Sequence, residues 1–121
     1  MQAMKYEPRS ETRLERYQKK LREGSILFPV ALVTVEFHGD ANLGFVVRAA
    51  ACFGARSVHV IGAVPPHREL KKYSGSTEWL VDIVQHQTPS QFLAWRREQG
   101  DAANLVVAEL RDSSQSLYAL S

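Results

Sequence analysis

Apolar residues along this chain fall into short runs separated by polar stretches, and their spacing changes from one run to the next. Residues 28–37 (FPVALVTVEF) are rich in β-branched side chains and almost continuously apolar. That pattern predicts a strand buried on both faces, as in a parallel sheet. A helix over residues 43–53 and a second short strand over residues 57–61 follow it. This order, within roughly 30 residues, predicts a βαβ unit with a right-handed crossover.

The helix expected over residues 43–53 has a single apolar face, formed by Val46, Ala50 and Phe53. Gly54 follows the last apolar position, and glycine commonly ends a helix there. Cys52 is the one cysteine of the chain, so an internal disulfide is excluded. Because it lies in a run of small and apolar residues, we expect a small core side chain rather than a reactive thiol.

The second half of the chain continues the alternation. The elements expected there are an irregular connection over residues 62–78, a strand over 79–85, a helix from Thr88 to Gly100 and a strand over 104–110. Thr88 and Gln91 have the spacing of a capping box, and Pro89 suits the first helical position. Together these elements predict an α/β fold, with a mostly parallel sheet and flanking helices.

Residues 1–24 are expected to form a polar helical extension, with a helix over residues 9–23 that stops at Gly24. Its apolar residues make one narrow stripe of Leu14, Tyr17 and Leu21. The remaining positions are mostly charged, and charge runs on helices usually face solvent. Two interpretations remain open, a solvated surface helix and an arm that contacts RNA phosphates.

Composition narrows the class of protein only a little. The 121 residues suit one domain, and 45% hydrophobic with 23% charged residues describes an ordinary globular chain. The formal net charge of +2 is too small to indicate a nucleic-acid partner. The four histidines show no metal-ligand spacing, so we expect no metal site. No segment has signal-peptide character or membrane-spanning length, so the expected location is the cytoplasm and no membrane is expected as a partner.

The most informative segment runs from Asn42 to Arg48, where the first strand is expected to meet the helix. Asn42 suits an N-cap, and Gly44 and Arg48 share a helix face because they are four residues apart. A helix N-terminus beside an arginine favours an anion such as phosphate. The alternative is that Asn42 only caps the helix and Arg48 is a surface cation, paired with an acid such as Glu36 or Asp40. The residues alone leave both interpretations open.

A second basic group lies in the connection over residues 62–78. It consists of His67, Arg68, Lys71 and Lys72. Such a cluster is usually a solvated loop, although RNA contact is a reasonable alternative beside the Asn42–Arg48 segment. Trp79 is expected in the core, with stacking on a base as the alternative.

The segment NLGFVVRAAACFGARSVHVIG, residues 42–62, resembles motif 1 of the SpoU/TrmH family of RNA ribose 2′-O-methyltransferases. The shared features are Asn-x-Gly-x-x-x-Arg, a helix of small residues, Phe-Gly, and a valine-rich strand that ends in glycine. SGSTEWL, residues 74–80, is similar to the family's segment before a short strand, though more weakly. The resemblance covers roughly residues 26–112.

This resemblance implies a SPOUT-type sheet with a C-terminal trefoil knot that binds S-adenosylmethionine, and usually a homodimer. Family members methylate a ribose 2′-OH in tRNA or rRNA without a metal. By the resemblance, Arg48 contacts phosphate and helps to activate the 2′-hydroxyl, and Asn42 holds the local geometry. We therefore assign catalysis to Arg48 and Asn42. RNA contacts are assigned to Gly44, Arg48, His67, Arg68, Lys71 and Lys72.

The family's donor site is built from later Gly-x-Glu, Ile-Pro-Met-x-Gly and Ser-Leu-Asn segments, and none of these occurs in the 121 residues. Ser116-Leu117-Tyr118 is not the last of them. We therefore expect residues 1–121 to form one truncated SpoU-type domain without the knot region. No donor-binding residue is assigned, and we expect the chain alone to be inactive. The alternatives are a non-catalytic RNA-binding or dimerising remnant of the family, or an unrelated α/β nucleotide-binding module.

Overall fold

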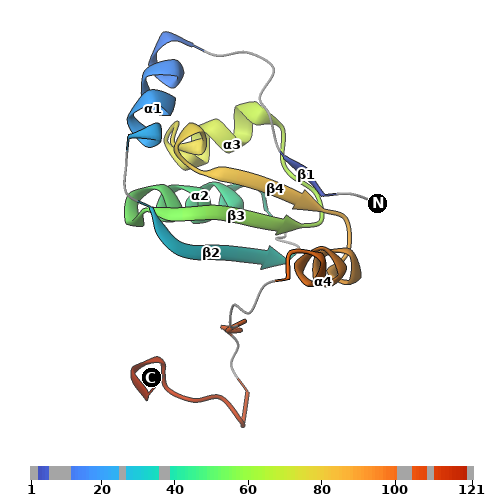
Figure 1. Cartoon of the computed structure of the whole chain (residues 1–121). Helices are drawn as coiled ribbons and strands as arrows, with labels where there is room; N and C mark the ends of the chain where they lie inside the picture. The colour runs from blue at the N-terminus through green and yellow to red at the C-terminus, as the bar shows by residue number, and fades with distance from the viewer. Residues whose placement is uncertain are drawn as a thin grey trace.

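The computed structural model contains one four-stranded sheet in the order β1-β4-β3-β2 (Figure 1). The residues it describes are 3–5, 12–24, 27–35, 39–100, 105–108 and 111–119. The strands are β1 (Met4–Lys5), β2 (Phe28–Val35), β3 (Ala55–Ile61) and β4 (Asp82–His86). β2, β3 and β4 are parallel, and β1 adds at the outer edge of β4 in the antiparallel direction. The predicted α/β class with a mostly parallel sheet is confirmed.

Helices flank both faces of the sheet. The helices are α1 (Arg13–Glu23), α2 (Asp40–Phe53), α3 (His67–Ser74) and α4 (Pro89–Glu98), with short 3-10 turns η1 (Glu78–Leu80) and η2 (Leu117–Ala119). α2 and α3 cover one face, whereas α4 lies across the other face near the ends of the strands (Figure 1). No helix in these described ranges has the length and apolar character needed to cross a membrane.

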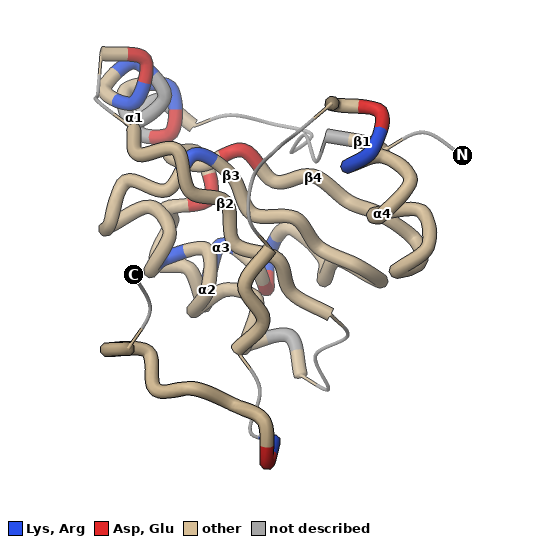
Figure 2. Tube along the Cα trace, turned by 60° about the horizontal axis from the view of Figure 1, so that its bottom comes forward, with Lys and Arg blue, Asp and Glu red and all other residues tan. Residues whose placement is uncertain are grey.

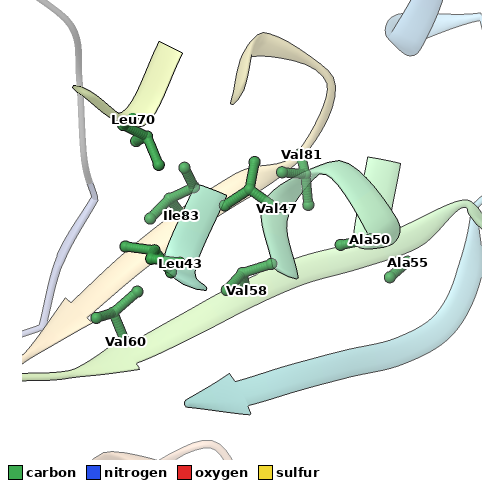
Figure 3. Packing of buried hydrophobic residues seen from close by; sticks show 9 residues of the cluster. All are labelled: Leu43, Val47, Ala50, Ala55, Val58, Val60, Leu70, Val81 and Ile83. Carbon is green, nitrogen blue, oxygen red and sulfur yellow. The ribbon is translucent and has the colours of Figure 1, made fainter. Parts of the chain in front are cut away.

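The hydrophobic core lies between the sheet and the α2–α3 layer, as Figure 3 shows. Its members are Leu43, Val47, Ala50, Ala55, Val58, Val60, Leu70, Val81 and Ile83. Val58 and Val60 of β3 are two residues apart, so both point to the same face. Each fully buried Val, Leu or Ile stabilises the fold by roughly 1.5–3 kcal/mol relative to an exposed one. This cluster therefore supplies the main hydrophobic stabilisation of the described residues.

The inward face of α2 differs from the predicted one. Leu43, Val47 and Ala50 are buried, whereas Phe53 is 79% exposed and Cys52 is also exposed. The predicted triplet of Val46, Ala50 and Phe53 has the same spacing and shares Ala50, so the pattern alone does not distinguish the two faces. The prediction that Cys52 belongs to the core is wrong for the same reason. The predicted stop is confirmed, because Gly54 ends α2 in the left-handed conformation with φ 73°.

β2 is not buried on both faces, contrary to the prediction. It is the outer strand of the sheet, and Phe28, Val30, Val33 and Val35 are exposed. The strand pairing is irregular between Phe28 and Ala31, around a proline that has no N–H to donate. The strand predicted over residues 104–110 would have lengthened the sheet, but its described part, residues 105–108, has no regular structure and is exposed.

The connection predicted over residues 62–78 contains the helix α3, which the sequence pattern did not indicate. α3 has only eight residues, most of them polar, and Leu70 is its one buried large apolar side chain, so the segment is easily taken for a loop. The strand predicted over residues 79–85 begins later, at Asp82, after η1. The predicted cap of α4 is confirmed, since Thr88 Oγ1 accepts from the backbone N–H of Gln91.

α2 and α3 approach each other most closely at Gly44, which is buried. A Cβ at Gly44 would overlap Tyr73 Cβ and lie 2.8 Å from the Tyr73 carbonyl carbon and 2.9 Å from Ser74 N. Two of these neighbours are backbone atoms, which cannot swing away as the end of a flexible side chain can. Glycine at position 44 is therefore required for this helix pair to pack as observed.

We expect Gly44→Ala to lower the free energy of unfolding by roughly 1–2 kcal/mol, because overpacking against α3 outweighs the better helix propensity of alanine. Urea unfolding measures this change. Gly24→Ala is the matched control, because a Cβ there meets only Leu21 O at 3.8 Å and the backbone is right-handed helical. A Gly44→Ala protein as stable as the wild type would contradict the packing argument.

The exposed apolar edge of β2 is expected to cause reversible self-association as protein concentration rises, because unpaired strand edges and apolar surface promote association. Val35→Lys should reduce this self-association in sedimentation velocity, since an edge lysine opposes strand pairing. Leu117→Lys removes an apolar side chain that is even more exposed, 74% against 54% for Val35, but lies away from the sheet, and it should have little effect. A strictly monomeric wild-type protein at all concentrations would overturn the expectation.

Candidate functional site

Arg48 lies on α2 one helical turn after Gly44, where α2 crosses the end of α3. Its side chain is exposed, and its Cδ, Nε and Cζ atoms lie 4.0 Å from the position that a Cβ on Gly75 would occupy. Gly75 ends α3, and the C-terminal end of a helix carries partial negative charge that attracts a guanidinium. Arg48 therefore rests against the end of α3 and remains open to solvent.

The turn beneath Arg48 uses its own backbone donors. Gly75 and Ser76 both have positive φ, 64° and 62°, and the backbone N–H groups of both donate to the carbonyl of Lys71. These amides are therefore not available to a bound anion. The Arg48 guanidinium faces solvent beside this turn, and no hydrogen bond or ion pair within the described residues holds it.

The sequence analysis predicted Asn42 as the N-cap of α2, and this prediction is wrong. The helix begins at Asp40, and Gly39 is the N-cap, with no side-chain hydrogen bond at that end. Asn42 is the third helical residue, and its side chain is exposed. Glu36 lies outside the described residues and the side chain of Asp40 is not described, so neither tests the alternative pairing of Arg48.

Gly44 is buried against α3, so the open backbone that we expected beside Arg48 is covered. Its effect on a ligand is therefore indirect, through the position of α2 relative to α3. The assignment of an RNA contact to Gly44 stays a prediction, as do those for Asn42 and Arg48. The structure brings Arg48 together with the turn at Gly75.

The four basic residues predicted to act together on residues 62–78 separate into two pairs on α3. Lys71 Nζ lies 2.9 Å from Glu15 Oε1 of α1, and His67 Nε2 lies 3.2 Å from Glu78 Oε1 of η1. Both partners are buried carboxylates. Arg68 and Lys72 are exposed, and the Lys72 ammonium lies 5.2 Å from the centre of the Tyr73 ring.

Glu15 was not singled out from the sequence, although it occupies a central place in this cluster. Its Oε2 accepts from Thr12 N at 2.7 Å, while Glu15 N donates to Thr12 Oγ1, which completes a capping box. Burial would raise the pKa of the Glu15 carboxyl, but the Thr12 amide, Lys71 and Trp79 outweigh it and lower the pKa to about 2. The hydrogen bond to Glu15 raises the pKa of Lys71 in turn. The Thr-x-x-Glu spacing was the signal that could have indicated this residue.

Glu15, His67 and Glu78 each offer one ligand atom within 4.8 Å of the others, a separation that a metal ion could bridge. The Lys71 ammonium already contacts Glu15 there, and the Ser74 hydroxyl donates to Glu78 Oε2 at 2.9 Å. These groups therefore form a polar cluster that joins α1, α3 and η1. Trp79 is buried beside it, which agrees with the core placement expected for this residue.

Among the described side chains of α1, polar groups make the contacts that hold the helix to the domain. Tyr17 and Leu21 are exposed, whereas Arg22 donates to Asp82 Oδ1 at 2.8 Å and to the carbonyl of Arg56 at 3.0 Å. Acidic and basic positions are mixed along α1 (Figure 2). The arrangement fits a docked surface helix, and the interpretation of α1 as an RNA-contacting arm stays a prediction.

Comparison with known proteins indicates the family to which the chain, and with it this site, belongs. A model of the SpoU rRNA methylase family matches residues 29–121. Among solved structures, the chain is similar to one titled as the crystal structure of an RNA 2′-O ribose methyltransferase, with 26% identity and a TM-score of 0.53. That match covers 60% of this chain and 28% of the other chain. A search of curated proteins found no match.

The matched region of the family model contains the whole of α2, α3 and the turn at Gly75, with Arg48 among them. It also spans three of the four strands of the sheet. The hypothesis of an unrelated nucleotide-binding module is therefore excluded, and the chain belongs to the SpoU rRNA methylase family.

Proposed function

We propose that this chain serves in S-adenosylmethionine-dependent methylation of a ribose 2′-hydroxyl in tRNA or rRNA, and that it supplies the RNA-facing side of the site. The observation that carries the proposal is the exposed Arg48 guanidinium on α2, held beside the turn at Gly75 within the family-matched region. The similarity to a solved RNA 2′-O ribose methyltransferase supports the reaction class.

The chemistry of the guanidinium limits what Arg48 can do. A guanidinium has N–H donors and no acceptor atom, so it is not suited to remove the proton from a 2′-hydroxyl. It can bind a phosphate oxygen through a planar pair of N–H donors, and it can stabilise negative charge that develops on the attacking oxygen. Its role in the proposal is therefore to position the RNA and to favour the ionised form of the 2′-oxygen.

The other residues that we propose to contact RNA are judged by whether their side chains are exposed. Arg68 and Lys72 are exposed on α3, so they can add phosphate contacts beside Arg48. His67 and Lys71 are engaged with buried carboxylates, and their contribution would be to hold α3 in place. Asn42 is exposed near the start of α2 and can contact the same RNA segment.

The described part of the chain has no segment that matches the family's donor-binding loops. Residues 105–108 and 111–119 are exposed throughout, and the family's donor-site segments do not occur in the 121 residues. S-adenosylmethionine would supply the methyl group, and no residue described here is assigned to it. The proposal also includes a homodimer in the cytoplasm, on the strength of the family resemblance.

Arg48→Ala should weaken binding to a tRNA or rRNA fragment about tenfold, since a hydrogen bond to a charged group contributes on the order of 1.5 kcal/mol. Losing one phosphate contact should also reduce the slope of log affinity against log salt by about one. Fluorescence anisotropy at several salt concentrations measures both quantities. The unfolding free energy should hardly change, because Arg48 is exposed.

Arg97→Ala is the matched control for Arg48→Ala, because it removes the same charge from an exposed position on α4. A site-specific contact predicts a large effect at Arg48 and a small one at Arg97. Equal effects from the two variants would indicate nonspecific charge attraction. Unchanged affinity in Arg48→Ala would remove the assignment.

Methyl transfer is tested by incubating the chain with tRNA, rRNA and S-adenosylmethionine labelled in its methyl group. Digestion of the RNA and mass spectrometry then detect labelled 2′-O-methylnucleosides. A labelled product that disappears in Arg48→Ala supports the enzyme. RNA binding that depends on Arg48 without any labelled product supports the RNA-facing role, and it agrees with the expectation that the chain alone is inactive.

A further inference from the structure

Two buried histidines form a hydrogen-bonded pair on the sheet face opposite the main core. His59 of β3 is 5% exposed and His86 of β4 is 3% exposed. His59 Nδ1 lies 3.0 Å from His86 Nε2, and the two rings stack with centroids 5.2 Å apart and an interplanar angle of 20°. His59 Nε2 also lies 3.2 Å from Ser57 Oγ. A continuous chain of polar atoms therefore runs from Ser57 to His86.

Helix α4 covers this pair with two aromatic rings. Trp95 has its ring centroid 4.7 Å from that of His59 and 5.3 Å from that of His86. Phe92 lies 5.9 Å and 5.2 Å from the same two centroids. Phe92 is the one buried residue of α4, and Leu93 is exposed. The attachment of α4 to the sheet therefore depends largely on aromatic contacts with the histidine pair.

The pair is satisfied when both rings are neutral. If the Ser57 hydroxyl donates to His59 Nε2, then His59 Nδ1–H donates to His86 Nε2, and the reverse order is equally consistent. One added proton places a charge among apolar rings, which is unfavourable without solvent. A second proton directs N–H at N–H across 3.0 Å and abolishes the shared hydrogen bond.

We propose that the His59–His86 pair is a pH-sensitive latch, which holds α4 on the sheet when both rings are neutral and releases it when they are protonated. Release would expose Ile61, which is buried on this face of β3, together with the inner sides of Phe92 and Trp95. The latch is independent of the proposed RNA site, which lies on the opposite layer.

Few charged groups on the neighbouring elements compete with this effect. On β4, Asp82 is paired with Arg22, two register positions before the level of His59. On α4, Arg96 follows Trp95 and adds a basic side chain, not a carboxylate, to that helix. On β1, Lys5 stands opposite Val84, and on β2 the residue opposite His59 is Val33. None of the groups placed here by the structure is a carboxylate free to stabilise an imidazolium.

The size of the pH response follows from the surroundings of His59 and His86, which shift their pKa values. Burial, assisted by the positive charge of a protonated His86, lowers the pKa of His59 from 6.5 to about 4, and burial lowers the pKa of His86 in the same direction. The released state has ordinary pKa values and therefore binds protons more readily. Release is favoured progressively as pH falls below 6.5, and the effect of His59 is complete below about 4. For His59 alone, the equilibrium constant for release should rise about 20-fold between pH 7 and pH 5.

Hydrogen–deuterium exchange of the wild-type chain tests the latch. Protection factors, corrected for the intrinsic pH dependence of exchange, are measured for peptides from α4 and from α2 at pH 7 and pH 5. The latch predicts a fall of about 20-fold in α4 with α2 little changed. Unchanged protection of α4 overturns the proposal, and so does an equal fall in α2, which indicates global unfolding.

Two variants separate the pair from other titrating groups. His59→Phe combined with His86→Leu replaces the pair by apolar side chains and should remove the pH response of α4. His67→Gln changes a histidine on the other layer and should leave that response intact. A response that survives the double change, or is lost in His67→Gln, assigns the effect to another group and overturns the latch. If the double variant does not fold, the wild-type exchange measurement and the His67→Gln control still decide the question.

Discussion

The close contact between α2 and α3 at Gly44 is the constraint on which the rest of the structure depends. Without a Cβ, Gly44 admits the backbone of Tyr73 and Ser74 against the surface of α2. This contact fixes the rotation of α2 about its own axis, so that Leu43, Val47 and Ala50 enter the core. The same rotation places Arg48 beside the end of α3. Core packing and the candidate site are therefore set by one interaction.

Features that depend on local chemistry could be predicted from the sequence. The mostly parallel sheet followed from β-branched runs separated by a helix, although the order of its strands was not predicted. The left-handed stop at Gly54 and the cap at Thr88 followed from residue type and spacing over four residues or fewer. The burial of Trp79 followed from its size and apolar surroundings. In each case the information lies within a few residues of the feature itself.

Features that depend on contacts distant in sequence could not be predicted. Two triplets on α2 fit the same period, and only α3 decides which of them is buried. α3 itself is short and mostly polar, with one buried large apolar residue, Leu70, so its sequence resembles that of a solvated loop. Nothing in the local pattern indicates that Lys71 meets Glu15, or that His59 meets His86. For the candidate site, the sequence indicated Arg48 but not the turn beside it, and it predicted Asn42 as the N-cap of α2, where the structure has Gly39.

The carboxylate of Glu15 takes part both in the N-terminal cap of α1 and in the contact between α1 and α3. One oxygen accepts the Thr12 amide and so starts α1, while the other contacts Lys71 on α3. Secondary structure at the N-terminus and its docking on the domain therefore share the same atoms. A short helix that is marginal by itself becomes part of the cooperative unit, because it cannot fray at its first turn without also releasing a buried ion pair. The N-terminal helix should then unfold together with the α2–α3 layer as one transition rather than as an independent appendage.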